Sequence, residues 1–186
     1  TLKEYTVRQD SLLWNYFNFT SFHLPDTIIC LGQVVDLTRP LVRERIEREL
    51  FKFYARRDKL VLWWKLYGRY GPIIRPALSE MELSEEFWVM AILEGLLDPK
   101  AVSPAKAVGV WQFMRETGRE YGLNKNHYLD ERKDVWKSTK AATKYLVDLY
   151  RMRLLSGVDG DGSVNYFIVL SYYNAGPGRI NTSIGR

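Results

Sequence analysis

The 186-residue sequence predicts a mainly α-helical protein. Over several long stretches, apolar residues recur at about every third or fourth position, which is the period of an amphipathic helix rather than of a strand. Residues that begin or end helices, such as serine, threonine, glycine and proline, flank these stretches. Hydrophobic residues make up 46% of the chain, enough to bury a core. We therefore expect one helical domain preceded by an N-terminal extension.

The extension begins without a clear pattern. Residues 1–37 mix aromatic and polar residues without a sustained period, so they predict an irregular or partly strand-like lead-in. A first helix is expected over about 40–55, because Thr38 can cap it and Pro40 suits its first turn. Aromatic and apolar residues then predict a second helix over about 59–67.

Gly68 and the pair Gly71-Pro72 are expected to end that second helix. One residue of Trp63-Trp64 is expected in the core, since helical aromatic residues are chiefly packing material. Ser84 then has the side chain of an N-cap, and Glu85-Glu86 follow it where negative charge suits a helix start.

The helix that Ser84 begins should end at Asp98-Pro99, because proline disfavours helical geometry in the residue before it. Glu94 would lie in its last turns. Periodic apolar residues predict a scaffold helix over 137–155, and glycines predict a linker over 157–163. A last buried helix is expected from about Val164 until the turn Gly176-Pro177-Gly178.

Charge and cysteine content narrow the classes of function. The net charge is +5, but Arg43, Arg45 and Arg48 alternate with glutamates, as on a solvated helix face. No nucleic-acid motif accompanies the charge, so nucleic acid is not an expected partner. Cys30, the only cysteine, is expected to be buried and inert. No apolar run reaches the roughly 18 residues of a membrane span. The sequence starts at Thr1 without a basic-then-apolar segment, so we expect a secretion signal to be either absent or already removed.

Glu94 is the candidate catalytic residue. It ends the apolar run Val89-Met90-Ala91-Ile92-Leu93, and burying a carboxylate is costly unless it is protonated or partnered. A glutamic acid in an apolar wall has a raised pKa and can serve as a general acid near neutral pH. On the residues alone, an exposed glutamate at a helix end is an equal alternative.

Three blocks occur in a fixed order along the chain. They are Ala91-Ile92-Leu93-Glu94-Gly95, then Ala101-Val102-Ser103-Pro104 with Gly109-Val110-Trp111-Gln112, and finally Tyr173-Asn174-Ala175-Gly176-Pro177-Gly178-Arg179. This order resembles the lytic transglycosylase (SLT) family of the goose-lysozyme-like fold, in particular its membrane-bound lytic murein transglycosylase D subgroup. The resemblance covers about residues 82–180. It implies a lysozyme-like helical catalytic domain over 81–186, truncated at its C-terminus relative to the family, and a helical extension over 1–80.

The resemblance also assigns roles to residues. It implies that Glu94 is the catalytic acid and base, and that the saccharide groove includes Gln112, Tyr173, Asn174, Ser103 and Gly109. Gly95 departs from the family, which has serine there, so a positioning hydrogen bond is missing. We expect the Tyr173 phenol near Glu94, where it could hold the carboxyl group. Without the resemblance, a loop amide that satisfies its own backbone is the alternative for Gln112.

The implied reaction is non-hydrolytic cleavage of the β-1,4 bond from N-acetylmuramic acid to N-acetylglucosamine, leaving 1,6-anhydromuramyl ends. One glutamate suffices if the substrate's N-acetyl group assists. No metal or cofactor is expected. Asp98 and Glu116 are further carboxylates within reach by sequence proximity, but each is explained as a helix-end charge.

The expected partners are peptidoglycan glycan strands, with cell-envelope or divisome proteins as further partners. The protein itself is expected to be a monomer. The expected place is the bacterial cell envelope, in the periplasm or at the outer membrane. Two alternatives stay open: a goose-type lysozyme that admits water, and a catalytically silent murein-binding module, which the glycine at position 95 suggests.

Overall fold

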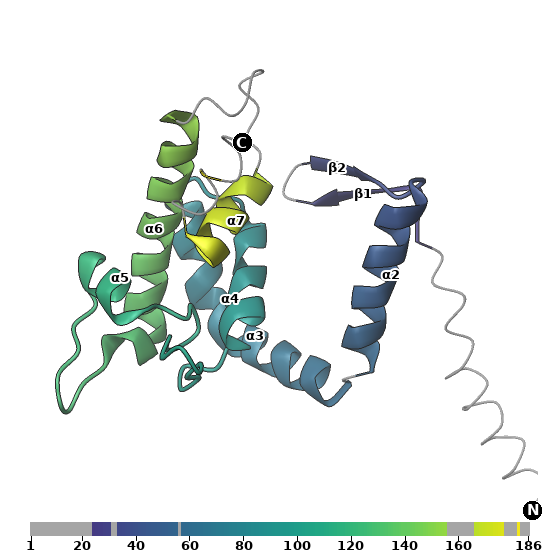
Figure 1. Ribbon diagram of the computed structural model, residues 1–186. Coiled ribbons are helices and arrows are strands. Elements are labelled where there is room, and N and C mark those ends of the chain that lie inside the picture. The colour runs from purple at the N-terminus through teal and green to yellow at the C-terminus, as the bar shows by residue number, and fades with distance from the viewer. Residues whose placement is uncertain (1–23, 31–32, 56, 156–165, 177–181, 183–186) are drawn as a thin grey trace, which may run out of the picture.

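The computed structural model describes residues 24–30, 33–55, 57–155, 166–176 and 182. It is mainly α-helical, as the sequence predicts, with one small antiparallel sheet in the described residues (Figure 1). The first part of the lead-in, the linker expected over 157–163 and the turn residues Pro177 and Gly178 lie outside the described residues.

The described part of the lead-in forms a β-hairpin. Strand β1 (Thr27–Cys30) pairs with β2 (Gln33–Asp36) in antiparallel register, with Ile29 opposite Val34. The base of the hairpin is closed where the N–H of Leu37 donates to the carbonyl of Asp26 at 2.7 Å. The partly strand-like lead-in is thus confirmed in this segment.

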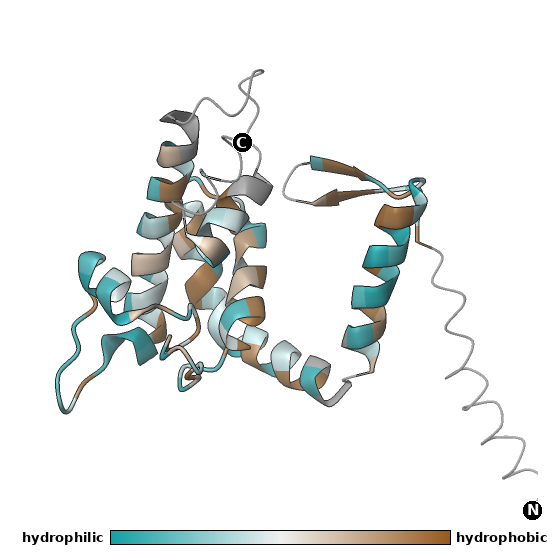
Figure 2. Ribbon diagram, viewed as in Figure 1, coloured by the Kyte–Doolittle hydropathy of each residue, from teal (hydrophilic) through white to brown (hydrophobic). Residues whose placement is uncertain are grey.

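Helix α2 (Pro40–Tyr54) begins and ends close to where the sequence predicts. It is mostly hydrophilic and lies apart from the other helices (Figure 2). Arg43 fastens it to the hairpin, because its guanidinium donates to the carbonyls of Leu37 (3.0 Å) and Leu24 (3.2 Å). It also pairs with Asp26 at 3.5 Å. The hairpin and α2 therefore form a connected pair of elements.

Helix α3 (Arg57–Ser79) corrects the expected stop at Gly68 and Gly71-Pro72, because it runs through these residues and through Pro76. Each internal proline removes one helical hydrogen bond. Both prolines are exposed, whereas Ile74 and Leu78 on the opposite side are buried in the core. Packing of that apolar face overrides the local breakers. Trp63 packs against the core and Trp64 is 76% exposed, so one tryptophan of the pair is a core residue, as expected.

The helix bearing Glu94 starts where predicted but ends earlier. Ser84 caps the 3₁₀ turn Glu85–Phe87 by accepting from the N–H of Glu86 at 3.3 Å, and α4 (Trp88–Gly95) follows directly. Leu96 then takes a left-handed conformation with φ 53°, and the N–H of Leu97 returns to the carbonyl of Ala91 at 3.0 Å. This left-handed cap ends the helix before Asp98-Pro99.

The remaining helices complete the core. They are α5 (Arg115–Glu120), the 3₁₀ turn Glu131–Lys133, α6 (Val135–Leu155) and α7 (Tyr166–Ala175). Helix α6 packs against both α3 and α7, and the buried cluster also includes α4 and the segment between α4 and α5. Within the described residues, no helix is long and apolar enough to cross a membrane.

Candidate active site

Glu94 lies in the last turn of α4 and lines a cavity of about 460 Å³. Its side chain is half-buried, and this burial raises the pKa of its carboxyl group. Three parts of the chain contribute the walls: the β-hairpin, the 3₁₀ turn with α4, and α7. The lining residues besides Glu94 are Ile29, Cys30, Glu86, Phe87, Val89, Met90, Leu93, Leu170 and Asn174. The cavity thus combines an apolar wall with one acid whose proton is held more tightly than usual.

Gly95 accounts for the close packing behind Glu94. A Cβ at this position would lie 2.4 Å from the carbonyl oxygen of Gly109 and 2.8 Å from the Cα of Val110. Any side chain, including the family's serine, would therefore collide with backbone. Because Gly95 has none, the loop between α4 and α5 lies directly against the end of α4.

Gly109 is required in the same loop for a different reason. Its φ of 82° is left-handed, and a Cβ there would lie 2.0 Å from the carbonyl oxygen of Arg132. The sequence analysis assigned Gly109 to substrate binding. The structure places it as a buried turn residue that lets three backbone segments meet.

Arg132 holds the loop from the other side. Its side chain is 3% exposed and donates to the carbonyls of Phe113 (3.0 Å) and Lys106 (3.3 Å). Two further bonds reach the carboxylate of Asp130, at 2.9 and 2.7 Å, and lower the pKa of Asp130. The N–H of Lys137 donates to Asp134 at 2.9 Å, so the charges in this region cap the start of α6 and pair with one another.

Gln112 turns its amide toward its own loop. Its Nε2 donates to the carbonyl of Gly109 at 2.8 Å, and its backbone has a left-handed φ of 46°. This is the loop-amide alternative raised for Gln112. The neighbouring Trp111 is fully buried, and its indole N–H donates to the hydroxyl of Thr139 at 3.0 Å. The turn is therefore fixed from both sides.

Tyr173 connects α7 to this loop. Its hydroxyl donates to the carbonyl of Trp111 at 2.7 Å, not to Glu94 as the sequence analysis supposed. Burial, followed by the negative charge of Glu94, raises the pKa of the Tyr173 phenol. The two residues are thus close enough to interact electrostatically, although the hydrogen bond goes to backbone. The preceding residue, Tyr172, is fully buried in the core.

Two further predicted site residues occupy different places. Asn174 lines the cavity with Glu94, and its Nδ2 donates to the carbonyl of Leu170 at 3.1 Å. Ser103 closes a tight turn instead, because its Oγ accepts from the N–H of Ala107 at 3.0 Å. The structure therefore brings Glu94 and Asn174 into one cavity, with Tyr173 beside them, and keeps Ser103 within its own turn.

Several residues of the cavity were not expected at the site, among them Glu86, Ile29 and Cys30. Glu86 was interpreted only as a helix-start charge, yet Glu86, Met90 and Glu94 are spaced as one stripe of a helix and share the cavity. That spacing was an available signal. Ile29 and Cys30 carried no comparable signal, because the local sequence of a hairpin does not predict which distant helices it contacts. Cys30 was expected to be buried but is partly exposed.

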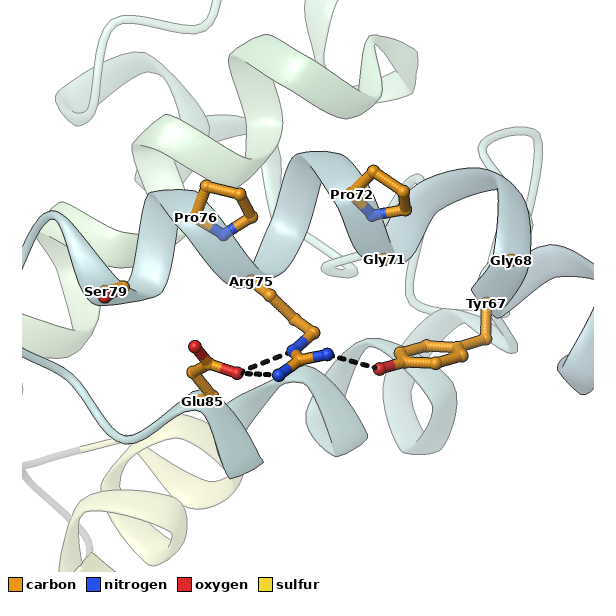
Figure 3. A pocket seen from close by; sticks show the side chains of 8 residues that line it. All are labelled: Tyr67, Gly68, Gly71, Pro72, Arg75, Pro76, Ser79 and Glu85. Atoms are coloured by element: carbon orange, nitrogen blue, oxygen red, sulfur yellow. Dashed lines mark hydrogen bonds and ion pairs between the residues drawn. The ribbon is translucent and has the colours of Figure 1, made fainter.

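A second cavity of about 460 Å³ lies along α3 and is also lined by Glu85 (Figure 3). The charged groups that line it bind each other. The guanidinium of Arg75 forms an ion pair with Glu85, with Nε to Oε2 at 2.6 Å, and reaches the hydroxyl of Tyr67 at 3.4 Å. These contacts fasten α3 to the 3₁₀ turn before α4. They support the position of α4 and so of Glu94.

Comparison with known proteins adds independent findings. The transglycosylase SLT domain family matches residues 72–186, more than half of the chain. The membrane-bound lytic murein transglycosylase D proteins of Escherichia coli strains K12 and O6:H1 are each 37% identical over 107 residues. The match covers 58% of this chain but only 22% of each relative.

Proposed function

The chain belongs to the transglycosylase SLT domain family, and from that premise we propose that it is a peptidoglycan lytic transglycosylase. Its substrate would be the glycan strand, cut at the β-1,4 bond from N-acetylmuramic acid to N-acetylglucosamine. The product would carry a 1,6-anhydromuramyl end. Residues 81–186 would form the catalytic domain and residues 1–80 an extension. The relatives' names, which include murein and membrane-bound, support a place in the cell envelope.

In the proposed reaction Glu94 acts first as acid and then as base. Its carboxyl group gives a proton to the glycosidic oxygen as the bond from that oxygen to C1 of the muramyl sugar breaks. The sugar's own N-acetyl oxygen assists departure, so a second protein carboxylate is not needed. The muramyl 6-hydroxyl oxygen then bonds to C1, and its proton returns to Glu94.

The observation that carries this proposal is the setting of Glu94. A half-buried carboxyl with a raised pKa, on an apolar wall of a cavity, keeps its proton to a higher pH than an ordinary glutamate, as a general acid requires. The position of Tyr173 also supports the proposal. The phenol uses its one hydrogen to donate to the carbonyl of Trp111, and the lone pairs of its oxygen can accept a hydrogen bond from a protonated Glu94.

The alternative of a lysozyme-type hydrolase rests on Glu86. This second carboxylate lines the same cavity as Glu94, so it is a candidate for holding an attacking water. The alternative of a silent binding module has less support. It arose from the missing serine at position 95, and the packing of Gly95 gives the glycine a structural reason.

The test is digestion of isolated peptidoglycan, with released ends identified by mass spectrometry. Glu94→Gln keeps the shape of the side chain but has no acidic proton, and it should abolish release. Glu116→Gln is the matched control, because Glu116 is exposed in the first turn of α5 and lies outside the cavity. Unchanged release by Glu94→Gln would refute the assignment. Loss of turnover in Glu86→Gln, with reducing ends in the wild type, would favour the hydrolase.

A further inference from the structure

The β-hairpin forms one wall of the cavity that contains Glu94. Ile29 and Cys30 of β1 line this cavity opposite residues of α4 and α7 such as Leu93 and Leu170. Cys30 also packs against the buried cluster. The hairpin extends from the top of α2 toward α7 in Figure 1. A segment outside the residues that the SLT family matches therefore contributes directly to the candidate active site.

The hairpin is held in place at its base rather than by the cavity. Leu37, which follows β2, is fully buried. The guanidinium of Arg43 binds the carbonyls of Leu37 and Pro25, and pairs with Asp26. These contacts fix both ends of the hairpin to α2. The wall formed by Ile29 thus has its own support and does not depend on bound substrate.

Ile29 presents an apolar side chain that nothing covers in the described residues, since it is 73% exposed. Its cross-strand partner Val34 is 69% exposed but does not line the cavity. Covering an exposed isoleucine beside a catalytic acid with an apolar sugar face removes apolar surface from water, which favours binding. In the same contact, the isoleucine displaces water from the sugar.

Water is the reactant that separates the two outcomes of the proposed chemistry. In one, the muramyl 6-hydroxyl oxygen bonds to C1 as the bond from C1 to the N-acetyl oxygen breaks, and the hydroxyl proton goes to the Glu94 carboxylate, which gives an anhydro end. In the other, a water oxygen bonds to C1 as the same bond breaks, and a proton of the water goes to the Glu94 carboxylate, which gives a reducing end. Excluding water protects the intramolecular reaction, which already benefits from proximity.

We propose that the β1–β2 hairpin, through Ile29, covers the muramyl residue bound at Glu94 and excludes water, so that the 6-hydroxyl captures C1. This inference rests on the proposed function. It makes Ile29 a specificity-determining residue for the product, with the acetylated glycan strand as the molecule that the hairpin covers.

The first test compares Ile29→Thr with Val34→Thr in the full chain. Both changes keep a β-branched side chain, so the strands should be preserved equally. The measured quantity is the ratio of anhydromuramyl to reducing ends released from peptidoglycan. We expect Ile29→Thr to lower this ratio at least severalfold, and Val34→Thr to leave it unchanged. Equal ratios in both variants and the wild type would overturn the inference. Absence of any released ends in the wild type would instead refute the proposed function.

The second test does not depend on turnover. Cys30 is the only cysteine, so iodoacetamide reports on the hairpin wall alone. In the Glu94→Gln protein, which should bind without cleaving, soluble peptidoglycan glycan fragments should slow alkylation of Cys30 severalfold. An unchanged rate at fragment concentrations that saturate binding would show that the strand does not reach the hairpin, and would overturn the inference.

Discussion

A Cβ on Gly95 would lie 2.4 Å from the carbonyl oxygen of Gly109. This relationship reverses the expectation that the missing serine weakens the site, because the chain packs backbone where the family carries a side chain. The absence of a side chain at Gly95 lets the end of α4 pack directly against the backbone of the following loop.

Restoring serine at position 95 should therefore destabilise the protein. Gly95→Ser forces the Gly109–Val110 backbone to move, and overpacking of this kind costs about 1–3 kcal/mol. Thermal unfolding should show a lower Tm and peptidoglycan release should fall. The control is Gly68→Ser, because a Cβ at Gly68 meets nothing within 4 Å. A Gly95→Ser protein with wild-type Tm and higher activity would contradict the packing argument.

Removing the Tyr173 hydroxyl should weaken both stability and activity. Tyr173→Phe leaves the carbonyl of Trp111 without its donor, which costs about 1–3 kcal/mol. Activity should fall roughly ten- to a hundredfold, since a misplacement of about 1 Å near the reacting atoms can cost a hundredfold. Tyr128→Phe serves as control, because Tyr128 is 95% exposed. Wild-type kcat/KM in Tyr173→Phe would remove Tyr173 from the site.

The pH dependence of activity should follow Glu94. Burial raises the pKa of this carboxyl, so the proton needed for the first step persists to a higher pH than for an ordinary glutamate. Release of glycan ends should decline as the pH rises through that raised pKa. In the described residues, Glu86 and Cys30 line the same cavity and the phenol of Tyr173 lies beside it, so these titratable groups also face the site and Glu86→Gln should be profiled in parallel. A decline centred near the ordinary pKa of glutamate, about 4.3, would contradict a raised value.

The same shift predicts a stability effect with a definite sign. A folded pKa above the unfolded one favours the folded state at low pH, and this contribution is lost as the pH rises through the folded value. Glu94→Gln removes the cost of burying the charge. The variant should therefore unfold at a slightly higher Tm than the wild type at pH 8. The gain should be small because the side chain is half-exposed to solvent, and it should vanish below about pH 4.

Arg132 should be among the most sensitive structural positions. Arg132→Met removes the guanidinium that donates to the carboxylate of Asp130 and to the carbonyls of Phe113 and Lys106, and breaking a buried ion pair costs about 3–5 kcal/mol. The urea midpoint at pH 7 should drop markedly. Arg119→Met, at an exposed position of α5, should leave the midpoint nearly unchanged. Similar midpoints for both variants would show that the contacts of Arg132 with the loop do not stabilise the fold.

Helices with a clear local pattern of apolar residues could be predicted from the sequence. Helices α2 and α6 follow from their apolar period, and the position of Glu94 near the end of α4 follows from the apolar run before it. Thr38, which was expected to cap α2, instead donates its hydroxyl to Asp36. Local breakers misled at α3, where burial of Ile74 and Leu78 outweighs the prolines. The site was predicted in part. The acceptor of Tyr173 is a backbone carbonyl, and the reach of Ile29 depends on tertiary packing, so neither has a sequence signature.

In the proposed reaction Glu94 catalyses cleavage in which the sugar's own hydroxyl replaces water. We would test this by digesting peptidoglycan in heavy-oxygen water and identifying the ends by mass spectrometry. We expect anhydromuramyl ends without heavy oxygen, present with the wild type and absent with Glu94→Gln. Ends that carry heavy oxygen would show hydrolysis, and unlabelled anhydro ends that persist in Glu94→Gln would show that another residue is the acid.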